Sequence, residues 1–226
     1  SNPISCVDNP SINFTAIGTP VGMFSDCIKD IDGNVYKTVT IGTQTWMAEN
    51  LKTSKYSDGI IIPNVKDSLE WDKLTTGAWC YYNNTSTIGG VYGKLYNWYA
   101  VNDPRGLAPA GYHIPTNDEW TTFISYLSNY WRRSSPGSVL KEEGTTHWYS
   151  PNTDAVNYEG FTALPGGCRN NYGSTFNLMR LNGYWWSSSE TNTTEARHVG
   201  MSYNDVMISR LYASKSNGFS VRLIKN

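Results

Sequence analysis

Three acidic and amide side chains near the start of the chain are the first residues that could bind a metal ion. Asp30, Asp32 and Asn34 are spaced like the opening of a calcium-binding loop. Such a loop ends in a bidentate glutamate, and this sequence has Ile41 at that position. Asp32-Gly33 is instead a strong hairpin signal, because glycine tolerates the positive φ of a tight turn. We therefore predict a β-turn here.

A second polar run, Tyr203-Asn204-Asp205, lies just before the last predicted strands. Calcium takes roughly six to eight oxygen ligands, and two oxygen-bearing side chains on one stretch are too few for a site. We predict an Asn-Asp turn and no cofactor, with calcium left open as the minor alternative.

No group of residues matches a known catalytic motif. His113, His147 and His198 lie in no HExxH, no GxSxG elbow is present, and no glycine-rich phosphate loop precedes a helix. Glu142 and Glu143 are adjacent and would point apart on a helix, which does not suit an acid/base pair. We predict a hydrogen-bonded structural role for His113 and no enzymatic activity.

Four widely spaced cysteines, Cys6, Cys27, Cys80 and Cys168, form no CxxC pair of the kind that holds zinc. In an exported protein the local pairing is Cys6 with Cys27, which would lower the entropy of the unfolded chain by roughly 3 kcal/mol. Four buried thiols are the alternative, and the sequence leaves both open.

Composition excludes several classes of protein. The 226 residues include 18 basic and 19 acidic side chains, 16% charged in all, together with 16 Tyr and 9 Trp. A soluble protein averages roughly 25% charged residues, so this chain is no candidate for nucleic-acid binding, a coiled coil or charge-rich disorder. No apolar run is long enough to span a membrane and the N-terminus resembles no leader; a lipid anchor in a removed segment remains an expectation.

The residue pattern predicts an α+β fold. Thr116 and Glu119 have capping-box spacing, and the apolar residues from Trp120 to Trp131 follow at steps of three and four, which predicts an amphipathic helix. A shorter helix is predicted over 95–101. The predicted strands gather mostly at the two ends of the chain and cover 27–31, 35–41, 161–164, 184–187, 198–201, 206–211 and 219–224. We expect an extension or linker over 1–28 and one domain over 29–226.

Five ordered blocks resemble one family, the Fibrobacter succinogenes major paralogous domain, which also shows the block at Gln44–Leu51. The blocks are Tyr92–Val101, Pro109–Thr116 with Glu119-Trp120, Phe161–Gly167, Gly183–Ser188 and Gly218–Arg222. The resemblance covers about residues 29–226.

That family is in turn similar, at Trp186-Ser187-Ser188 and at its Gly-Phe-Ser-Val-Arg strand, to the C-type lectin-like superfamily. The similarity implies small sheets in which the termini meet, two main helices and long irregular loops that display a ligand site, in a protein outside the bacterial cell. The last 46 residues also resemble the variable proteins of diversity-generating retroelements, whose scaffold blocks are interspersed with polar residues.

Polar and aromatic side chains between these blocks form the candidate ligand surface, with an ordinary exposed sheet face as the alternative. Tyr203, Arg210 and Tyr212 are the preferred anchors, because Tyr and Arg dominate energetic hot spots. The predicted ligand-binding residues are Tyr172, Asn182, Asn192, Arg197, Met201, Tyr203, Asn204, Met207, Ser209, Arg210, Tyr212 and Lys215.

These observations favour an extracellular binding module, displayed at the bacterial surface, that recognises a protein or glycan of a host or neighbouring cell without chemistry. The alternative is a structural subunit of a surface fibre or stalk, in which the same surface packs against a neighbouring subunit.

Overall fold

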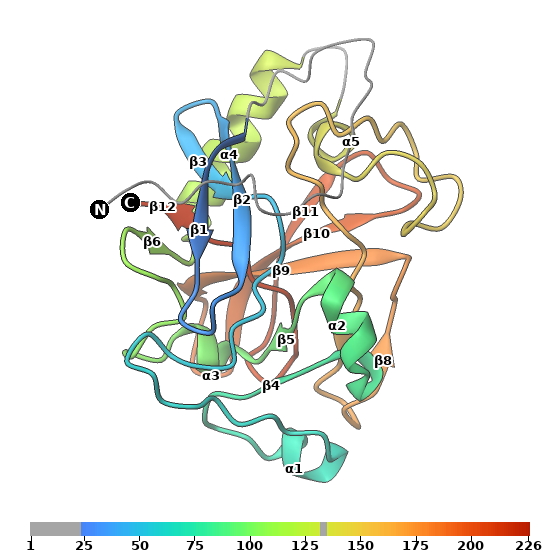
Figure 1. Cartoon of the computed structure of the whole chain (residues 1–226). Helices are drawn as coiled ribbons and strands as arrows, with labels where there is room; N and C mark the ends of the chain where they lie inside the picture. Colours follow the sequence, from blue (N-terminus) through green and yellow to red (C-terminus); the bar gives the residue numbers. More distant parts are fainter. Residues whose placement is uncertain (1–23, 132–134) are drawn as a thin grey trace.

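The two ends of the described chain meet in one five-stranded antiparallel sheet (Figure 1). The computed structural model describes residues 24–131 and 135–226. The C-terminal strand inserts between two earlier strands, where Ile224 lies opposite both Trp46 and His113. The strands in spatial order are β1 (Phe24–Lys29), β2 (Val35–Ile41), β3 (Gln44–Met47), β12 (Ile224–Lys225) and β6 (Tyr112–His113).

The predicted turn between β1 and β2 is confirmed. The Asp30 carboxylate accepts hydrogen bonds from the backbone N–H groups of Asp32 and Asn34 and from the Tyr36 hydroxyl. Gly33 has a φ of 90°, which a residue with a side chain rarely adopts. The Asp30 side chain therefore stabilises the turn, and its hydrogen bond from Tyr36 links the turn to β2.

A second antiparallel sheet has the order β11-β10-β9, so that β11 forms one edge. The predicted strands 184–187 and 198–201 lie inside β9 and β10, and the strand predicted over 206–211 begins later, at Ile208. Two further pairs of strands are short. The bounds are β9 (Asn182–Glu190), β10 (Glu195–Ser202), β11 (Ile208–Ser214), β4 (Trp79–Cys80), β5 (Leu95–Tyr96), β7 (Cys168–Arg169) and β8 (Phe176–Asn177).

The long predicted helix is α4 (Asn117–Tyr130), and its capping box is present. Glu119 accepts from the Thr116 backbone N–H at 2.7 Å, and its own N–H donates to the Thr116 hydroxyl at 3.2 Å. Trp120, Phe123 and Leu127 are buried at the predicted spacing, so one face of α4 packs on the core.

The remaining helices are short, and one prediction is corrected. Only Trp98–Val101 of the helix expected over 95–101 is helical, because Leu95–Tyr96 pairs with β4 and Asn97 caps the helix with its side chain. The other short helices are α1 (Ser68–Asp72), α2 (Ser86–Tyr92), α3 (Trp98–Val101), α5 (Pro136–Leu140) and the 3₁₀ turn η2 (Tyr82–Asn84).

Two predicted strands are only partly regular. In 161–164 a single bridge links Ala163 to Lys141, and no strand forms. In 219–224 the backbone bonds go to several partners: Phe219 exchanges both bonds with Tyr96, and regular pairing is confined to β12. Backbone partners that change every two residues give an extended segment without a continuous ladder.

Two core clusters lie on opposite sides of the β9–β10 layer. Trp185 and Trp186 are adjacent and fully buried, yet Trp185 packs with Trp46, Phe123 and α4 whereas Trp186 packs in the other cluster. Successive side chains of a strand point to opposite faces. The last stretch repeats this division, with Phe219, Val221 and Leu223 in the Trp186 cluster and Ile224 in the Trp185 cluster.

Arg222 belongs to this last stretch, is fully buried, and links the stretch to two other segments of the chain. Its guanidinium donates to Asn50 Oδ1 at 3.0 Å, to the Met47 carbonyl at 3.1 Å and to the Thr162 carbonyl at 2.9 Å. The same group lies 4.2 Å from the centre of the Phe161 ring. Arg222 therefore holds the irregular 161–162 segment against the sheet.

The described cysteines divide into two kinds. Cys27 is disulfide-bonded, whereas Cys80 and Cys168 are buried free thiols. The alternative of four thiols is therefore wrong, and the second member of the predicted local pair, Cys6, lies outside the described residues.

The α+β class is confirmed by the mixture of antiparallel sheets and helices. The C-type lectin-like assignment stays a prediction. The predicted N-terminal extension covers residues 1–28. Its last residues, 24–28, belong to β1, which pairs with β2. Residues 1–23 lie outside the described part. No helix in the described ranges is both long and apolar enough to cross a membrane.

Replacing Arg222 by methionine should lower the free energy of unfolding by about 3 kcal/mol or more, because several buried carbonyl oxygens would lose their donor. Urea denaturation at neutral pH measures the change. Arg210→Met, at an exposed position, is the matched control and should cost less than about 1 kcal/mol. Equal losses in the two variants would contradict the crosslinking role.

Candidate functional site

Exposure divides the predicted ligand residues into three groups. Three are partly buried, namely Asn182, Arg197 and Tyr203, and two are buried, namely Met201 and Lys215. The exposed ones are Tyr172, Asn192, Asn204, Met207, Ser209, Arg210 and Tyr212.

The inclusion of Met201 and Lys215 in the ligand surface is corrected. Met201 is 2% exposed and packs in the Trp185 cluster, because its face of β10 lies over the core. Lys215 donates to the Glu190 carboxylate and to the Thr193 carbonyl, and its ammonium lies 4.8 Å from the centre of the Trp98 ring. Both side chains hold the sheet together and face no solvent.

Two turns at the ends of these strands use their polar residues internally. The Asn192 side chain accepts from the N–H groups of Thr194 and Glu195 and so closes the β9–β10 hairpin. Asn204 accepts from the Ser202 hydroxyl, and the Asp205 carboxylate accepts from the Met207 N–H. The predicted Asn-Asp turn is therefore confirmed.

Tyr203 and Arg210, two of the three preferred anchors, have structural contacts as well as exposed surface. Tyr203 is partly buried against the Trp185 cluster, and its N–H donates to the Leu181 carbonyl. Arg210 is exposed and donates to the Thr121 hydroxyl on α4 at 2.7 Å. The third anchor, Tyr212, is 56% exposed and lies opposite Arg197 across the β10–β11 pair.

The most open part of this surface is the edge strand β11. Its residues 209–212 are exposed on both faces, and Leu211 and Tyr212 are each more than half exposed. Among the strands that the structure describes, β11 pairs only with β10, so every second residue directs its backbone N–H and C=O away from the sheet. Met207, 55% exposed, precedes the strand and extends the apolar surface.

Tyr172 lies on a separate loop that contacts the segment after β11. It is 86% exposed, between β7 and β8. The neighbouring Asn171 N–H donates to the Asn217 side chain at 2.6 Å. The structure thus joins the Tyr172 loop to the chain that leaves β11.

A neutral histidine lies inside the sheet that carries this surface. His198 is opposite Leu211 of β11 and is in ring contact with Trp186 and Phe219. Burial lowers the pKa of His198 to about 4, because the apolar surroundings disfavour the imidazolium form. The ring is therefore uncharged at neutral pH and packs as part of the core.

Three further side chains that could react, namely His113, Cys80 and Cys168, are hydrogen-bonded or protonated. His113 contacts Asn226 Oδ1 and the Glu119 carboxylate, each at 2.7 Å, which confirms its hydrogen-bonded structural role. Burial raises the pKa of the Cys80 thiol to about 12 and that of Cys168 to about 11. In the ranges that the structure describes, no group of three or more His, Cys, Asp or Glu residues could hold a metal ion.

Sequence reasoning missed a pocket beneath the β1–β2 turn. Nine residues line it, and Lys94 is buried at its wall. The one signal in the sequence was a lysine inside Tyr92–Val101, a run otherwise rich in aromatic and apolar residues. The apolar and aromatic neighbours in such a run are generally buried, but nothing in the sequence indicates what surrounds the lysine.

Comparison with known proteins identifies a family and nothing closer. The model of the Fibrobacter succinogenes major domain matches residues 39–225. No curated protein and no solved structure matches the chain. The resemblance found in the sequence is thus confirmed for this family, and the similarities to the C-type lectin-like superfamily and to the variable proteins stay predictions.

The pKa of His198 makes stability depend on pH. The folded pKa, about 4, lies below the unfolded value of roughly 6.5, so the contribution to stability is complete above pH 6.5 and declines as pH falls toward 4. Between pH 7 and pH 5 the parent should lose about 2 kcal/mol more than His198→Leu. Equal pH dependence in urea denaturation would show that the imidazole is not desolvated.

Substitutions at Lys215 and Tyr212 should differ in their effect on the free energy of unfolding, because Lys215 is buried and Tyr212 is exposed. Lys215→Met removes a buried charged donor and should lower the free energy of unfolding by about 2 kcal/mol. Tyr212→Ala, at an exposed position, should change it by less than about 1 kcal/mol. Thermal denaturation followed by circular dichroism measures both, and an unchanged stability of Lys215→Met would contradict the structural role of Lys215.

Proposed function

The chain belongs to the Fibrobacter succinogenes major domain family, and from this premise we propose that it is a non-catalytic binding module that recognises a protein through β11. The observation that carries the proposal is the exposure of residues 209–212 on both faces of an edge strand. Partners can add a strand to such an edge, gaining affinity from backbone hydrogen bonds and specificity from side chains.

The side chains of β11 suit recognition of a protein. Leu211 and Tyr212 offer apolar and aromatic area, and Arg210 and Ser209 offer hydrogen bonds. Tyrosine buries a large area at the cost of few torsions, and Tyr and Arg are enriched where interfaces derive most of their energy. An exposed apolar edge strand invites pairing with another chain unless it is covered or charged, which supports a partner.

The elements behind β11 favour a rigid binding surface. β10 pairs with β11 over seven consecutive residues, from Glu195 opposite Ser214 to Met201 opposite Ile208. β10 is itself buried between the two core clusters, through Val199 on one face and Ala196 on the other. A partner that binds β11 would therefore meet a strand whose conformation is already fixed, which lowers the entropic cost of binding.

An extracellular location fits this proposal. Cys27 is disulfide-bonded, and disulfides persist mainly in oxidising compartments. The second candidate function, a structural subunit of a surface fibre, uses the same strand, because β11 could equally pair with a neighbouring copy. The two functions differ in whether the occupant is a foreign protein or another copy of this chain.

The double variant Leu211→Lys/Tyr212→Ser should abolish partner binding by placing a charge on the edge and removing the aromatic anchor. An array of extracellular proteins and glycans, probed with the purified protein, should show capture of a protein that the variant binds about tenfold more weakly or worse. Unfolding free energies should stay within about 1 kcal/mol of the parent.

Leu69→Lys is the matched control, since Leu69 is 69% exposed on α1, and it should bind as the parent does. Undiminished capture by the double variant, or capture of glycans alone, would contradict protein recognition through β11. Concentration-dependent association in sedimentation velocity, lost in the double variant, would favour the structural subunit.

A further inference from the structure

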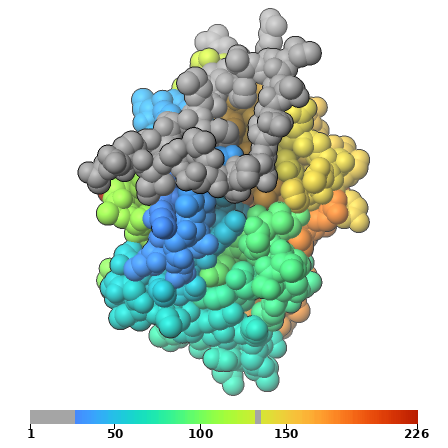
Figure 2. Space-filling model, viewed as in Figure 1, coloured from blue at the N-terminus to red at the C-terminus, as the bar shows by residue number. Residues whose placement is uncertain are grey.

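A pocket of about 450 Å³ lies between the β1–β2 turn, the segment after Leu51 and helix α2. Figure 2 shows these parts of the chain, blue and green, side by side on one face. Small-molecule sites are typically roughly 300–1,000 Å³. The lining residues are Asp32, Asn34, Lys52, Ser54, Tyr81, Ser86, Gly89, Gly90 and Lys94.

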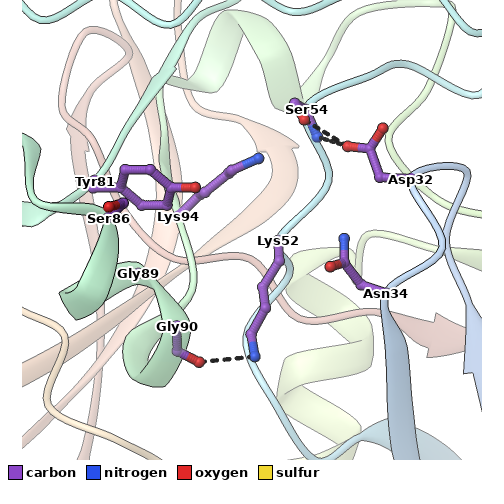
Figure 3. Close-up of a pocket in the computed structure, with 9 residues that line it drawn as sticks. All are labelled: Asp32, Asn34, Lys52, Ser54, Tyr81, Ser86, Gly89, Gly90 and Lys94. Carbon is purple, nitrogen blue, oxygen red and sulfur yellow. Dashed lines mark hydrogen bonds between the residues drawn. The ribbon is translucent and has the colours of Figure 1, made fainter.

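Lys94 differs from every other buried lysine or arginine that the structure describes. It is 4% exposed, and its ammonium donates no hydrogen bond to any described residue. Figure 3 shows the side chain directed into the pocket, across from Ser54 and Asp32. The other four, namely Lys141, Arg169, Lys215 and Arg222, each donate two or more hydrogen bonds to carbonyl or carboxylate oxygens or to an amide.

Aromatic rings partly compensate the Lys94 charge. The ammonium lies 3.8 Å from the centre of the Trp79 ring and 5.9 Å from that of Tyr81. Burial lowers the pKa of Lys94 to about 8, with Asp32 and Asp30 acting in the opposite direction. Lys94 is therefore mostly charged at neutral pH, and its three N–H donors have no acceptor among the described residues.

The walls of the pocket are fixed by contacts outside it. The Tyr36 hydroxyl accepts from the Lys52 N–H and donates to Asp30, joining the 52–54 segment to the β1–β2 turn. A Cβ at Gly89 would lie 2.0 Å from the Tyr81 ring, so this ring packs directly on the backbone of α2. The site is thus formed before any ligand arrives.

The charges around the pocket favour a singly charged anion. Lys52 and Lys94 are positive, and the Asp32 carboxylate is already engaged by the Ser54 N–H and hydroxyl and by Lys55 at 3.3 Å. The Lys52 ammonium donates to the Gly90 carbonyl at 2.9 Å. Of the two lysines that line the pocket, Lys94 is therefore the one whose ammonium donates no hydrogen bond to a described residue, and it can bind one carboxylate.

The remaining lining groups are neutral and suit ligand hydroxyls. The Tyr81 and Ser86 hydroxyls and Asn34 Oδ1 have no hydrogen-bond partner in the described ranges. Together they present donors and acceptors around the ammonium, and the Tyr81 ring adds an apolar wall. One carboxylate among several hydroxyls is the pattern of a sugar acid.

We propose that this pocket binds a sugar acid of the hexuronate class, with the ligand carboxylate on the Lys94 ammonium and ring hydroxyls on Tyr81, Ser86 and Asn34. The site is separate from β11, and it adds a small-molecule or glycan-terminus specificity that protein recognition through β11 does not require. The function proposed for β11 does not depend on whether this pocket binds a sugar acid.

Titration of the ¹⁵N-labelled protein with D-galacturonate and D-glucuronate, followed by NMR, tests the site. The amide resonances of residues around the pocket should shift on titration. A sugar acid should bind about tenfold more tightly than galactose, which lacks the carboxylate, or acetate, which lacks the hydroxyls. Failure of both sugar acids to bind would overturn the proposal, as would inorganic phosphate or acetate binding equally well.

Lys94→Met keeps the packing on Trp79 and removes the charge. It should weaken sugar-acid binding about tenfold or more while leaving the melting temperature unchanged or raised, because the buried ammonium donates no hydrogen bond to a described residue. Lys66→Met, at an exposed lysine outside the pocket, is the matched control and should bind as the parent does.

Undiminished binding by Lys94→Met would overturn the role of the ammonium. If that variant does not fold, Lys94 is a structural residue and the proposal fails unless Tyr81→Phe, which removes one hydroxyl and keeps the ring on Gly89, weakens sugar-acid binding several-fold.

Discussion

Buried basic side chains that donate to backbone carbonyls hold together the irregular parts of this fold. Arg222 fixes the segment at Phe161, Arg169 donates to the carbonyls of Val65, Lys66 and Asp67, and Lys141 bridges the loops at Thr153 and Asp205. A buried carbonyl without a donor costs about 1–3 kcal/mol. One cation satisfies several at once, so long segments without regular secondary structure can be buried.

Aromatic rings lower the free-energy cost of burying these positive charges. The guanidinium of Arg169 lies 4.4 Å from the centre of the Trp71 ring, and the ammonium of Lys141 lies 5.6 Å from that of Trp148. Such contacts offset part of the cost of desolvation. Against this background Lys94 stands apart, because it has the aromatic contact without the carbonyls, and its open donors face a pocket.

Local structure could be read from the sequence where neighbouring residues decide it. The capping box of Thr116 and Glu119 and the apolar spacing after it predicted α4, and Asp32-Gly33 predicted the first turn. Prediction was wrong where a distant partner decides the conformation. Leu95–Tyr96 has the pattern of a helix but pairs with β4, and 161–164 has the pattern of a strand but is held by Arg222.

The sequence by itself determined the family, the α+β class and the alternation along β9 to β11, because these depend on motifs and on a period of two. Only the tertiary structure decided what covers each face: Met201 and Lys215 are buried, and Leu211 and Tyr212 are open. It alone placed Lys94 opposite Asp32 and Lys52. Alternation fixes which residues share a face, but the elements that pack on that face come from distant parts of the chain.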